Sequence, residues 1–120
     1  MNIGGLARCK VVAGKAGLDR EIENIAVMEV PDVIRYLRGK DLLLTSLYSV
    51  KDDEKAIRSL VQDLYDVGSS AIAIKTKRFV ENIPDVMISE GNRLGFPIIE
   101  MNHELSYVDI MTSLMRYILN

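Results

Sequence analysis

Short apolar runs and amphipathic segments alternate along the second half of the chain. Leu42–Leu44 is a continuous apolar run, and Ala71–Ile74 and Phe96–Met101 have a similar character. Such runs are typical of strands that are covered on both faces of a sheet. The order strand, helix, strand, helix, strand predicts right-handed crossovers and an α/β fold with a largely parallel three-strand core.

The two helices between these strands carry start and stop signals. In the first, Asp52–Glu54 places negative charge at the N-terminus, and Gly68 suits the C-terminal stop. The second starts near Pro84, a residue that fits the first turn of a helix, and stops at Gly95. Apolar residues recur at helical spacing in both segments: Ala56, Ile57, Leu60, Val61, Leu64 and Val67 in the first, and Val86, Met87 and Leu94 in the second.

The N-terminal third of the chain is less regular. Arg8–Ala13 is short and rich in Val, which predicts a strand, and Gly14–Gly17 supplies two glycines for a turn. A second strand with an irregular start is expected within Ile22–Val30, and a short helix follows Pro31 and ends at Gly39. We therefore expect an N-terminal strand pair beside the parallel core, whether or not the two strands form a hairpin.

The last segment predicts a long C-terminal helix that reaches the final residue. Ser106 and Asp109 have the spacing of a capping box, and neither Gly nor Pro ends the pattern. We therefore expect a chain cut from the front of a larger protein, with residues 1–120 forming one regulatory domain. The apolar residues that step by three, four and three positions are Val108, Met111, Met115 and Ile118, and Ile110, Leu114 and Leu119 widen this face.

Composition and charge limit the classes of function. A chain of 120 residues with 48% hydrophobic residues fits one globular domain. A net charge of −2 gives no electrostatic reason to approach nucleic acid or an anionic membrane. Cys9 is the only cysteine, which excludes an intrachain disulfide and is compatible with the cytoplasm. No apolar run approaches the ~20 residues of a membrane helix, so we expect a soluble cytoplasmic protein.

The familiar signals of catalysis are missing. No nucleophile–base pair or metal cluster emerges from the sequence. His103 is the only histidine, and no second His or Cys accompanies it in the way an ordinary zinc site requires. Gly14–Ala16 lacks the earlier glycine and the final Ser or Thr of a phosphate-binding loop. We therefore expect neither enzymatic activity nor a cofactor.

Polar residues follow the predicted parallel strands where each strand ends. In an open parallel sheet, ligands collect outside the carboxyl ends of the strands, where helix N-termini also direct backbone donors. This edge would suit a small polar ligand such as a base, an amide or a carboxylic acid. The positive cluster of Lys75, Lys77 and Arg78 at this edge also fits a solvated loop that binds no ligand. The candidate ligand-binding residues are Thr45, Ser46, Lys75, Thr76, Arg78, Glu100 and Asn102.

Several short pieces of the chain together resemble the N-terminal domain of PucR-type transcriptional regulators. They span roughly Leu6 to Met111 and are Val11–Gly14, Gly17–Arg20, Glu29–Asp32, Gly39–Thr45, Gly68, Ile74–Lys75 and Gly95–Glu100. The resemblance implies an effector-sensing domain of a cytoplasmic regulator that binds DNA through a C-terminal helix-turn-helix, and the namesake responds to purine catabolism. Leu47 stands where family members commonly have Gly, which would make a loop near the ligand bulkier.

Three functions remain open at this point. The first is a module that senses a purine-related or other small polar metabolite and signals through the last helix. The second is a dimerisation module in which that helix pairs with its twin, and the third, least supported, is a small enzyme. The pattern is also similar to α/β domains that precede HPr kinase and Mur ligase catalytic domains. No basic recognition helix is present, so contact with DNA is expected only from domains outside this chain.

Overall fold

The computed structural model describes residues 9–28, 33–77, 80–101 and 106–119, apart from the side chains of residues 33, 113, 114 and 117–119. The chain order is the alternation that the sequence pattern predicts. The strands are β1 (Lys10–Ala13), β2 (Asn24–Val27), β3 (Asp41–Thr45), β4 (Ala71–Lys75) and β5 (Ile98–Met101). The helices are α1 (Glu54–Asp66), α2 (Asp85–Leu94) and α3 (Tyr107–Leu119), with short 3-10 helices η2 (Lys15–Gly17), η3 (Val33–Tyr36) and η4 (Tyr48–Val50).

The described strands form one sheet in the order β1-β5-β4-β3-β2. The expected parallel core of β3, β4 and β5 is confirmed, and β2 extends it in parallel beside β3. The expected N-terminal strand pair is wrong, because β1 pairs antiparallel with β5 and lies at the opposite edge from β2. The backbone N–H groups of Glu23 and Asn24 both bond to the carbonyl oxygen of Lys40, which aligns β2 along β3 instead.

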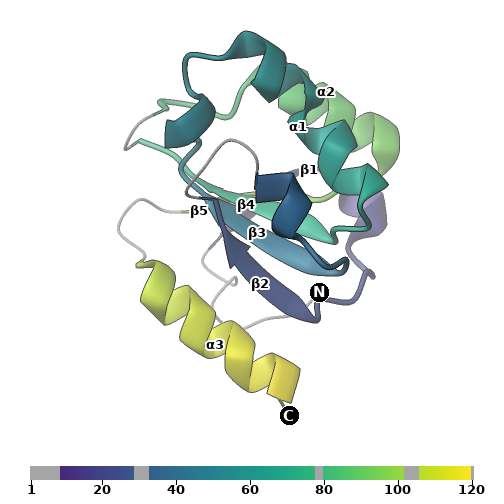
Figure 1. The fold of residues 1–120 in the computed structure, drawn as a ribbon, viewed down its shortest axis with the longest axis vertical. Coiled ribbons are helices and arrows are strands. Elements are labelled where there is room, and N and C mark those ends of the chain that lie inside the picture. The colour runs from purple at the N-terminus through teal and green to yellow at the C-terminus, as the bar shows by residue number, and fades with distance from the viewer. Residues whose placement is uncertain (1–8, 29–32, 78–79, 102–105, 120) are drawn as a thin grey trace.

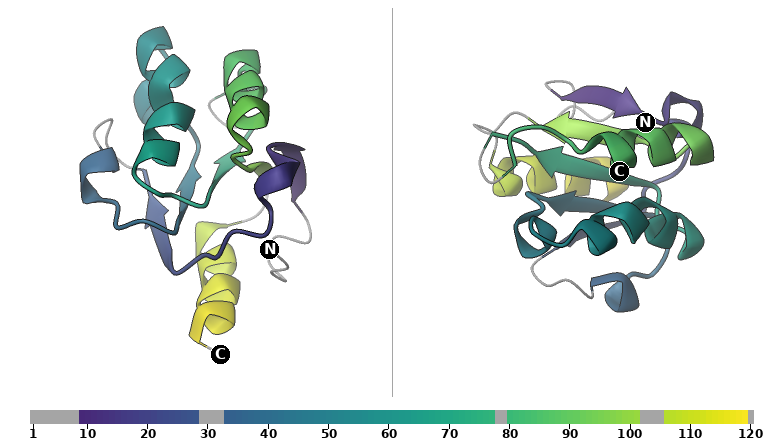
Figure 2. Two further views of the ribbon diagram at one scale, coloured as in Figure 1. Left: turned by 90° about the vertical axis from the view of Figure 1, so that its right-hand side faces the viewer. Right: turned by 90° about the horizontal axis from the view of Figure 1, so that it is seen from above.

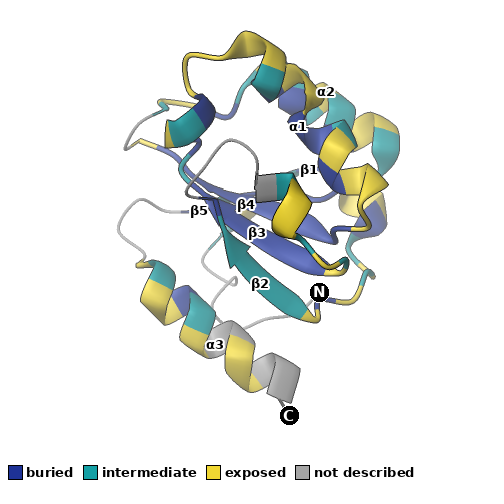
Figure 3. Ribbon diagram, viewed as in Figure 1, coloured by how far each residue is buried: buried dark blue, intermediate teal, exposed yellow. Residues whose placement is uncertain are grey.

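Helices cover both faces of the sheet (Figures 1 and 2). α1 and α2 lie on one face, and α3 lies on the other. Side chains alternate between the two: Leu43 and Ile72 belong to the core under α1 and α2, whereas Leu44 and Ala73 belong to the core under α3. The middle of the sheet is consequently buried from both sides (Figure 3).

The two expected helices between the strands end as their sequences predict. The carboxylate of Asp53 accepts a hydrogen bond from the N–H of Ala56 at 3.0 Å and caps α1. Gly68 follows α1 with a φ of 83°, and Gly95 ends α2 with a φ of 64°. These positive φ values are the left-handed conformation that glycine adopts without strain.

The C-terminal helix is present but is not long. α3 has 13 residues, as does α1. Its expected cap is confirmed, because the N–H of Asp109 donates to the hydroxyl oxygen of Ser106 at 3.1 Å. Ile110 is 1% exposed and packs on the sheet together with Tyr107 and Met111, which is the contact that holds α3 against this face.

The turn between β1 and β2 is packed so closely that it requires glycine. The N–H of Gly14 donates to the side chain of Asn92 on α2 at 2.9 Å. A Cβ atom on Gly17 would overlap the carbonyl oxygen of Gly95. The turn is therefore fixed against the end of α2, and it carries the chain across to β2.

We predict that Gly17→Ala lowers the free energy of unfolding by about 3 kcal/mol, because the new methyl group overlaps backbone that cannot move freely. Gly68→Ala is the matched control, since its Cβ would meet no atom closer than 3.7 Å and only the positive φ opposes it. That control should lose about 1 kcal/mol. Urea denaturation measures both values, and equal losses in the two variants would contradict the close contact at Gly17.

Candidate functional site at the carboxyl edge of the sheet

Most of the predicted ligand residues lie where the parallel strands end. Arg78 and Asn102 lie outside the described residues, as does His103. The five that the structure describes are Thr45, Ser46, Lys75, Thr76 and Glu100, which end or follow β3 and β4 or, for Glu100, precede the last residue of β5. The described candidates thus gather at one edge of the sheet, as the sequence predicts, but the pattern did not assign each side chain to a face.

A hydroxyl and a carboxylate meet on the face that α1 and α2 cover. The hydroxyl of Thr76 donates to Oε1 of Glu100 at 3.0 Å, and Thr76 is 2% exposed. Hydrogen bonds to an ionised acceptor are stronger than neutral ones. No donor in the described part of the chain is within hydrogen-bond distance of Oε2 of Glu100. This oxygen can accept an N–H or O–H group from a ligand.

Thr45 lies on the same face and organises the turn that follows β3. Its hydroxyl oxygen accepts a hydrogen bond from the N–H of Leu47 at 2.9 Å, and its side chain is buried. Ser46, between them, is half-buried. Thr45 thus shapes the edge through the backbone, which is a structural role that the sequence analysis did not assign to it.

Lys75 lies on the other face, beneath α3. It is 8% exposed, and its ammonium nitrogen is 4.6 Å from the centre of the Tyr107 ring. A desolvated ammonium over an aromatic face is attracted by the ring quadrupole. Because Tyr107 is the first residue of α3, this contact joins the end of β4 to the start of the last helix. Sequence reasoning missed Tyr107, although it directly follows the capping residue Ser106.

Two strand ends carry the same backbone feature. Leu47 has a φ of 64° and Lys77 a φ of 70°, and each lies two residues beyond the last residue of its strand, Thr45 or Lys75. Residues other than glycine adopt positive φ rarely, at a cost of about 1–2 kcal/mol each. Such conformations concentrate at ligand-binding sites and switch regions. Lys40, before β3 at the opposite edge, has the same feature with a φ of 55°, so among the described residues two of the three such positions lie at this edge.

The backbone conformation of Leu47 explains why Gly was expected at this position, because glycine adopts a left-handed φ without strain. The Leu47 side chain is 0% exposed and packs in the core under α1 and α2 with Val50. The expectation that Leu47 makes the ligand loop bulkier is thus wrong, because its side chain points into the core.

One further polar group near this edge escaped the sequence analysis. Ser49, in η4 after β3, has a buried hydroxyl oxygen with no hydrogen-bond partner in the described part of the chain. A buried hydroxyl without a partner is unfavourable by about 1–3 kcal/mol. The pattern offered no signal for it, since an isolated Ser in a loop is ordinary.

Metal and titratable groups add little at this edge. Across the described ranges, no group of three His, Cys, Asp or Glu side chains could hold a metal ion. None of the helices described is long and apolar enough to cross a membrane. Burial raises the pKa of the Cys9 thiol, which keeps it protonated near neutral pH. At the opposite edge, the hydrogen bond and charge of Glu23, followed by those of Glu21, raise the pKa of Lys40.

We predict that Lys77→Gly raises the free energy of unfolding by about 0.5–1 kcal/mol, because it removes the strain of positive φ. The variant loses an ion pair of 2.9 Å with Glu81, but both side chains are exposed and such pairs contribute little. Leu47→Gly is the comparison: it relieves the same strain but removes a buried side chain, and should lose about 2–4 kcal/mol. Chemical denaturation measures the free energy of unfolding of both variants. A lower value for Lys77→Gly than for the native chain would contradict the strain at this position.

Comparison with known proteins connects this geometry to a family of regulators. The purine catabolism regulatory protein of Bacillus subtilis (strain 168) is 32% identical over 120 residues, which are 100% of this chain and 23% of that protein. The transcriptional activator PmfR of Paenarthrobacter nicotinovorans is 26% identical over 101 residues, which are 84% of this chain and 22% of that protein. The chain thus spans less than a quarter of the length of these relatives. No solved structure matches it.

A family-level match covers nearly the whole chain as well. The profile of the PucR family, described as purine catabolism regulatory protein-like, matches residues 1–118. That range contains the sheet, α1, α2 and all but the last residue of α3, together with the described candidate residues at the carboxyl edge. Both relatives are named as regulators rather than as enzymes. The chain belongs to the purine catabolism regulatory protein-like family.

Proposed function

We propose that residues 1–120 are the N-terminal effector-sensing domain of a PucR-like transcriptional regulator. In this proposal the domain has no enzymatic activity and signals to a C-terminal helix-turn-helix outside this chain, which contacts the DNA. As a regulator of transcription, the protein would act in the cytoplasm. The observation that carries the proposal is the 4.6 Å contact between Lys75 and Tyr107, because it links the ligand edge to the first residue of α3.

The effector in this proposal is a small polar metabolite bound at the carboxyl edge. Oε2 of Glu100 offers an acceptor, and the Thr76 hydroxyl fixes the other oxygen of the same carboxylate. Polar donors of a ligand, such as amide or ring N–H groups, suit a carboxylate of this kind. The names of the relatives favour a purine or a product of purine breakdown as the first compounds to examine.

The signal would pass from the strand ends to α3. A ligand at the edge contacts the loops after β3 and β4, whose Leu47 and Lys77 hold strained conformations. A shift of the β4 end moves Lys75, and the ammonium carries Tyr107 and the start of α3 with it. Because a ligand shifts an equilibrium only by its different affinities for two states, the strain in these loops is where such a difference arises.

We predict that a purine or a purine breakdown product stabilises the chain in a thermal-shift screen. A ligand that binds only the native state adds about 2.7 kcal/mol at 100 times its dissociation constant. Thr76→Val combined with Glu100→Gln should abolish the shift, because the site then lacks the Glu100 carboxylate that accepts the ligand's N–H groups. Lys55→Gln, on the exposed surface of α1, is the control and should respond as the native chain does. A screen without any stabiliser, or a shift that survives the double substitution, would contradict binding at this edge.

A second candidate function is dimerisation through α3, supported by the apolar residues that this helix exposes. Of the four residues expected to carry signal or dimer contacts, Val108 is 70% and Met115 46% exposed, whereas Met111 packs partly on the sheet. The side chain of Ile118 lies outside the described residues. Met115 also borders a groove of about 460 Å³ between β2 and η3. An outward apolar face of this kind fits a homodimer contact.

We predict that Val108→Glu together with Met115→Glu converts a dimer into a monomer in multi-angle light scattering. Two carboxylates at the centre of an apolar contact repel each other and lose hydration. Lys55→Gln is again the control. A native chain that is strictly monomeric at high concentration would refute this candidate and would leave the sensing proposal unaffected.

A further inference from the structure

A hollow lies at the amino edge of the sheet, at the opposite end of the strands from the candidate effector site. Its volume is about 320 Å³, and its walls are Arg20, Glu21, Lys40, Gly68, Ser69 and Ser70. These residues precede β2, β3 and β4 in the chain. The hollow is thus formed by the segments that enter three neighbouring parallel strands, and no part of the proposed effector edge contributes to it.

Arg20 is held in place before any ligand arrives. Its guanidinium carbon is 5.3 Å from the ring centre of Tyr65 and 5.7 Å from that of Phe96. One of its nitrogens, Nη1, donates to the carbonyl oxygen of Ser69 at 3.4 Å. A guanidinium fixed in this way loses little further freedom when it binds a partner.

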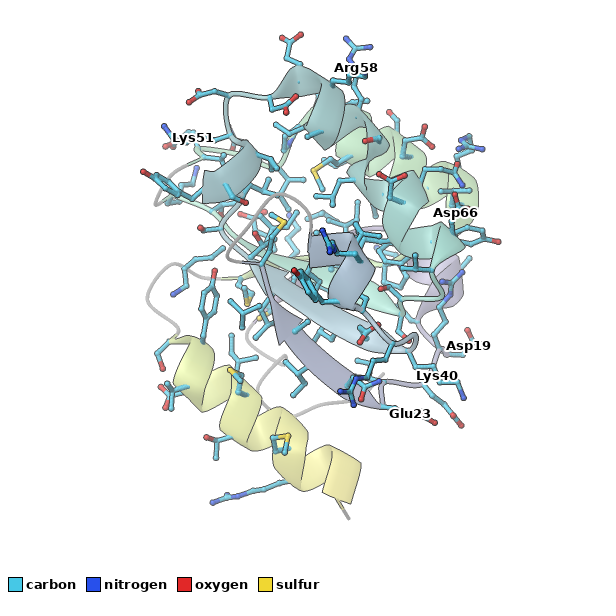
Figure 4. The ribbon with its side chains drawn as sticks, viewed as in Figure 1. Asp19, Glu23, Lys40, Lys51, Arg58 and Asp66 are labelled. Atoms are coloured by element: carbon cyan, nitrogen blue, oxygen red, sulfur yellow. The ribbon has the colours of Figure 1, made fainter. Side chains whose placement is uncertain are left out.

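The charge and most of the donors of Arg20 remain available. A guanidinium has several N–H groups in one plane, and its plane matches the two oxygens of a carboxylate or phosphate. Within the described residues, no carboxylate is at ion-pair distance from Arg20. The end of α1 supplies only about half a negative charge. Lys40 differs, because Glu21 and Glu23 lie at 3.4 and 3.3 Å from its ammonium nitrogen. Figure 4 shows Lys40 beside Glu23.

A buried hydroxyl in the wall of the same hollow also lacks a partner. Ser69 is 1% exposed, and its hydroxyl oxygen makes no hydrogen bond in the described part of the chain. The neighbouring hydroxyl of Ser70 is satisfied, since it donates to the carbonyl oxygen of Glu21. Buried hydroxyls are normally paired, so an orphan beside a hollow indicates a missing acceptor.

We propose that this amino-edge hollow binds a small oxyanion, a carboxylate or a phosphate group. Arg20 supplies paired N–H donors to the anion, and the buried Ser69 hydroxyl in the wall of the hollow rotates to donate to it as well. An anion bound here would connect the β1–β2 turn, which carries Arg20, to the end of α1, which precedes Ser69. The proposal rests on groups at the opposite end of the sheet from the effector edge, so either can fail without the other.

The test is an NMR titration of the full 120-residue chain with inorganic phosphate and, separately, with acetate. Sodium chloride at matched ionic strength is the reference. We expect saturable shifts of the Arg20 Nε–H signal and of the Ser69 and Ser70 amides with at least one of the two anions. Saturation by phosphate alone indicates a phosphate-bearing ligand, and saturation by acetate alone indicates a carboxylate. Shifts with neither anion, or the same shifts with chloride, would overturn the proposal.

Substitutions separate a built site from general attraction to positive charge. Arg20→Gln should weaken binding roughly tenfold or more, and Ser69→Ala roughly two- to tenfold. Arg20→Lys keeps the charge but loses the planar pair of donors, so it should also weaken binding. This variant keeps the test valid if Arg20→Gln disturbs the fold. Arg58→Gln, at the far end of α1 from Lys40 in Figure 4, is the matched control and should bind as the native chain does. Native affinity in Arg20→Lys and Ser69→Ala would refute the assignment of these groups.

Discussion

The parallel pairing of β3 with β4 at the centre of the sheet is the interaction on which the rest of the structure depends. Every residue of both strands is buried, and the register brings Leu42 beside Ala71 and Thr45 beside Ile74. Strands buried on both faces require helices on both sides. The crossover α1 supplies one cover, and α3 supplies the other. The position of α3 is therefore a consequence of the central pair and not of its own sequence alone.

The elements could be predicted because each has a local signal. Apolar runs, helical spacing and the stops at Gly68 and Gly95 all act within a few residues of the chain. Strand partners have no such signal: Arg8–Ala13 and Ile22–Val30 both indicated strands, yet nothing local showed that they lie at opposite edges. That choice is made by contacts distant in sequence, such as the hydrogen bonds from the start of β2 to Lys40.

The candidate site shows the same division between local and distant information. The edge was predictable, since parallel strands end together and their last residues are polar. The face was predictable in part, because Lys75 alternates with Ala71 and Ala73 and so lies under α3. Its contact with Tyr107 was not, because that contact depends on where α3 docks. The sequence also offered no sign that the hydroxyls of Ser49 and Ser69 lack partners within the described residues, since only the folded chain shows this.

The uneven covering of the sheet limits how far α3 could move if it carries the proposed signal. Two helices pack on one face, whereas in the described chain α3 is the only helix on the other, held largely by Ile110 and its neighbours. Full detachment would expose Leu42, Leu44 and Ile99 to water, and each such side chain disfavours exposure by about 1.5–3 kcal/mol. A tilt or slide of the helix keeps these residues covered. In the proposed signalling, α3 would therefore change its tilt or position on the sheet by a small amount. It would not detach from the domain.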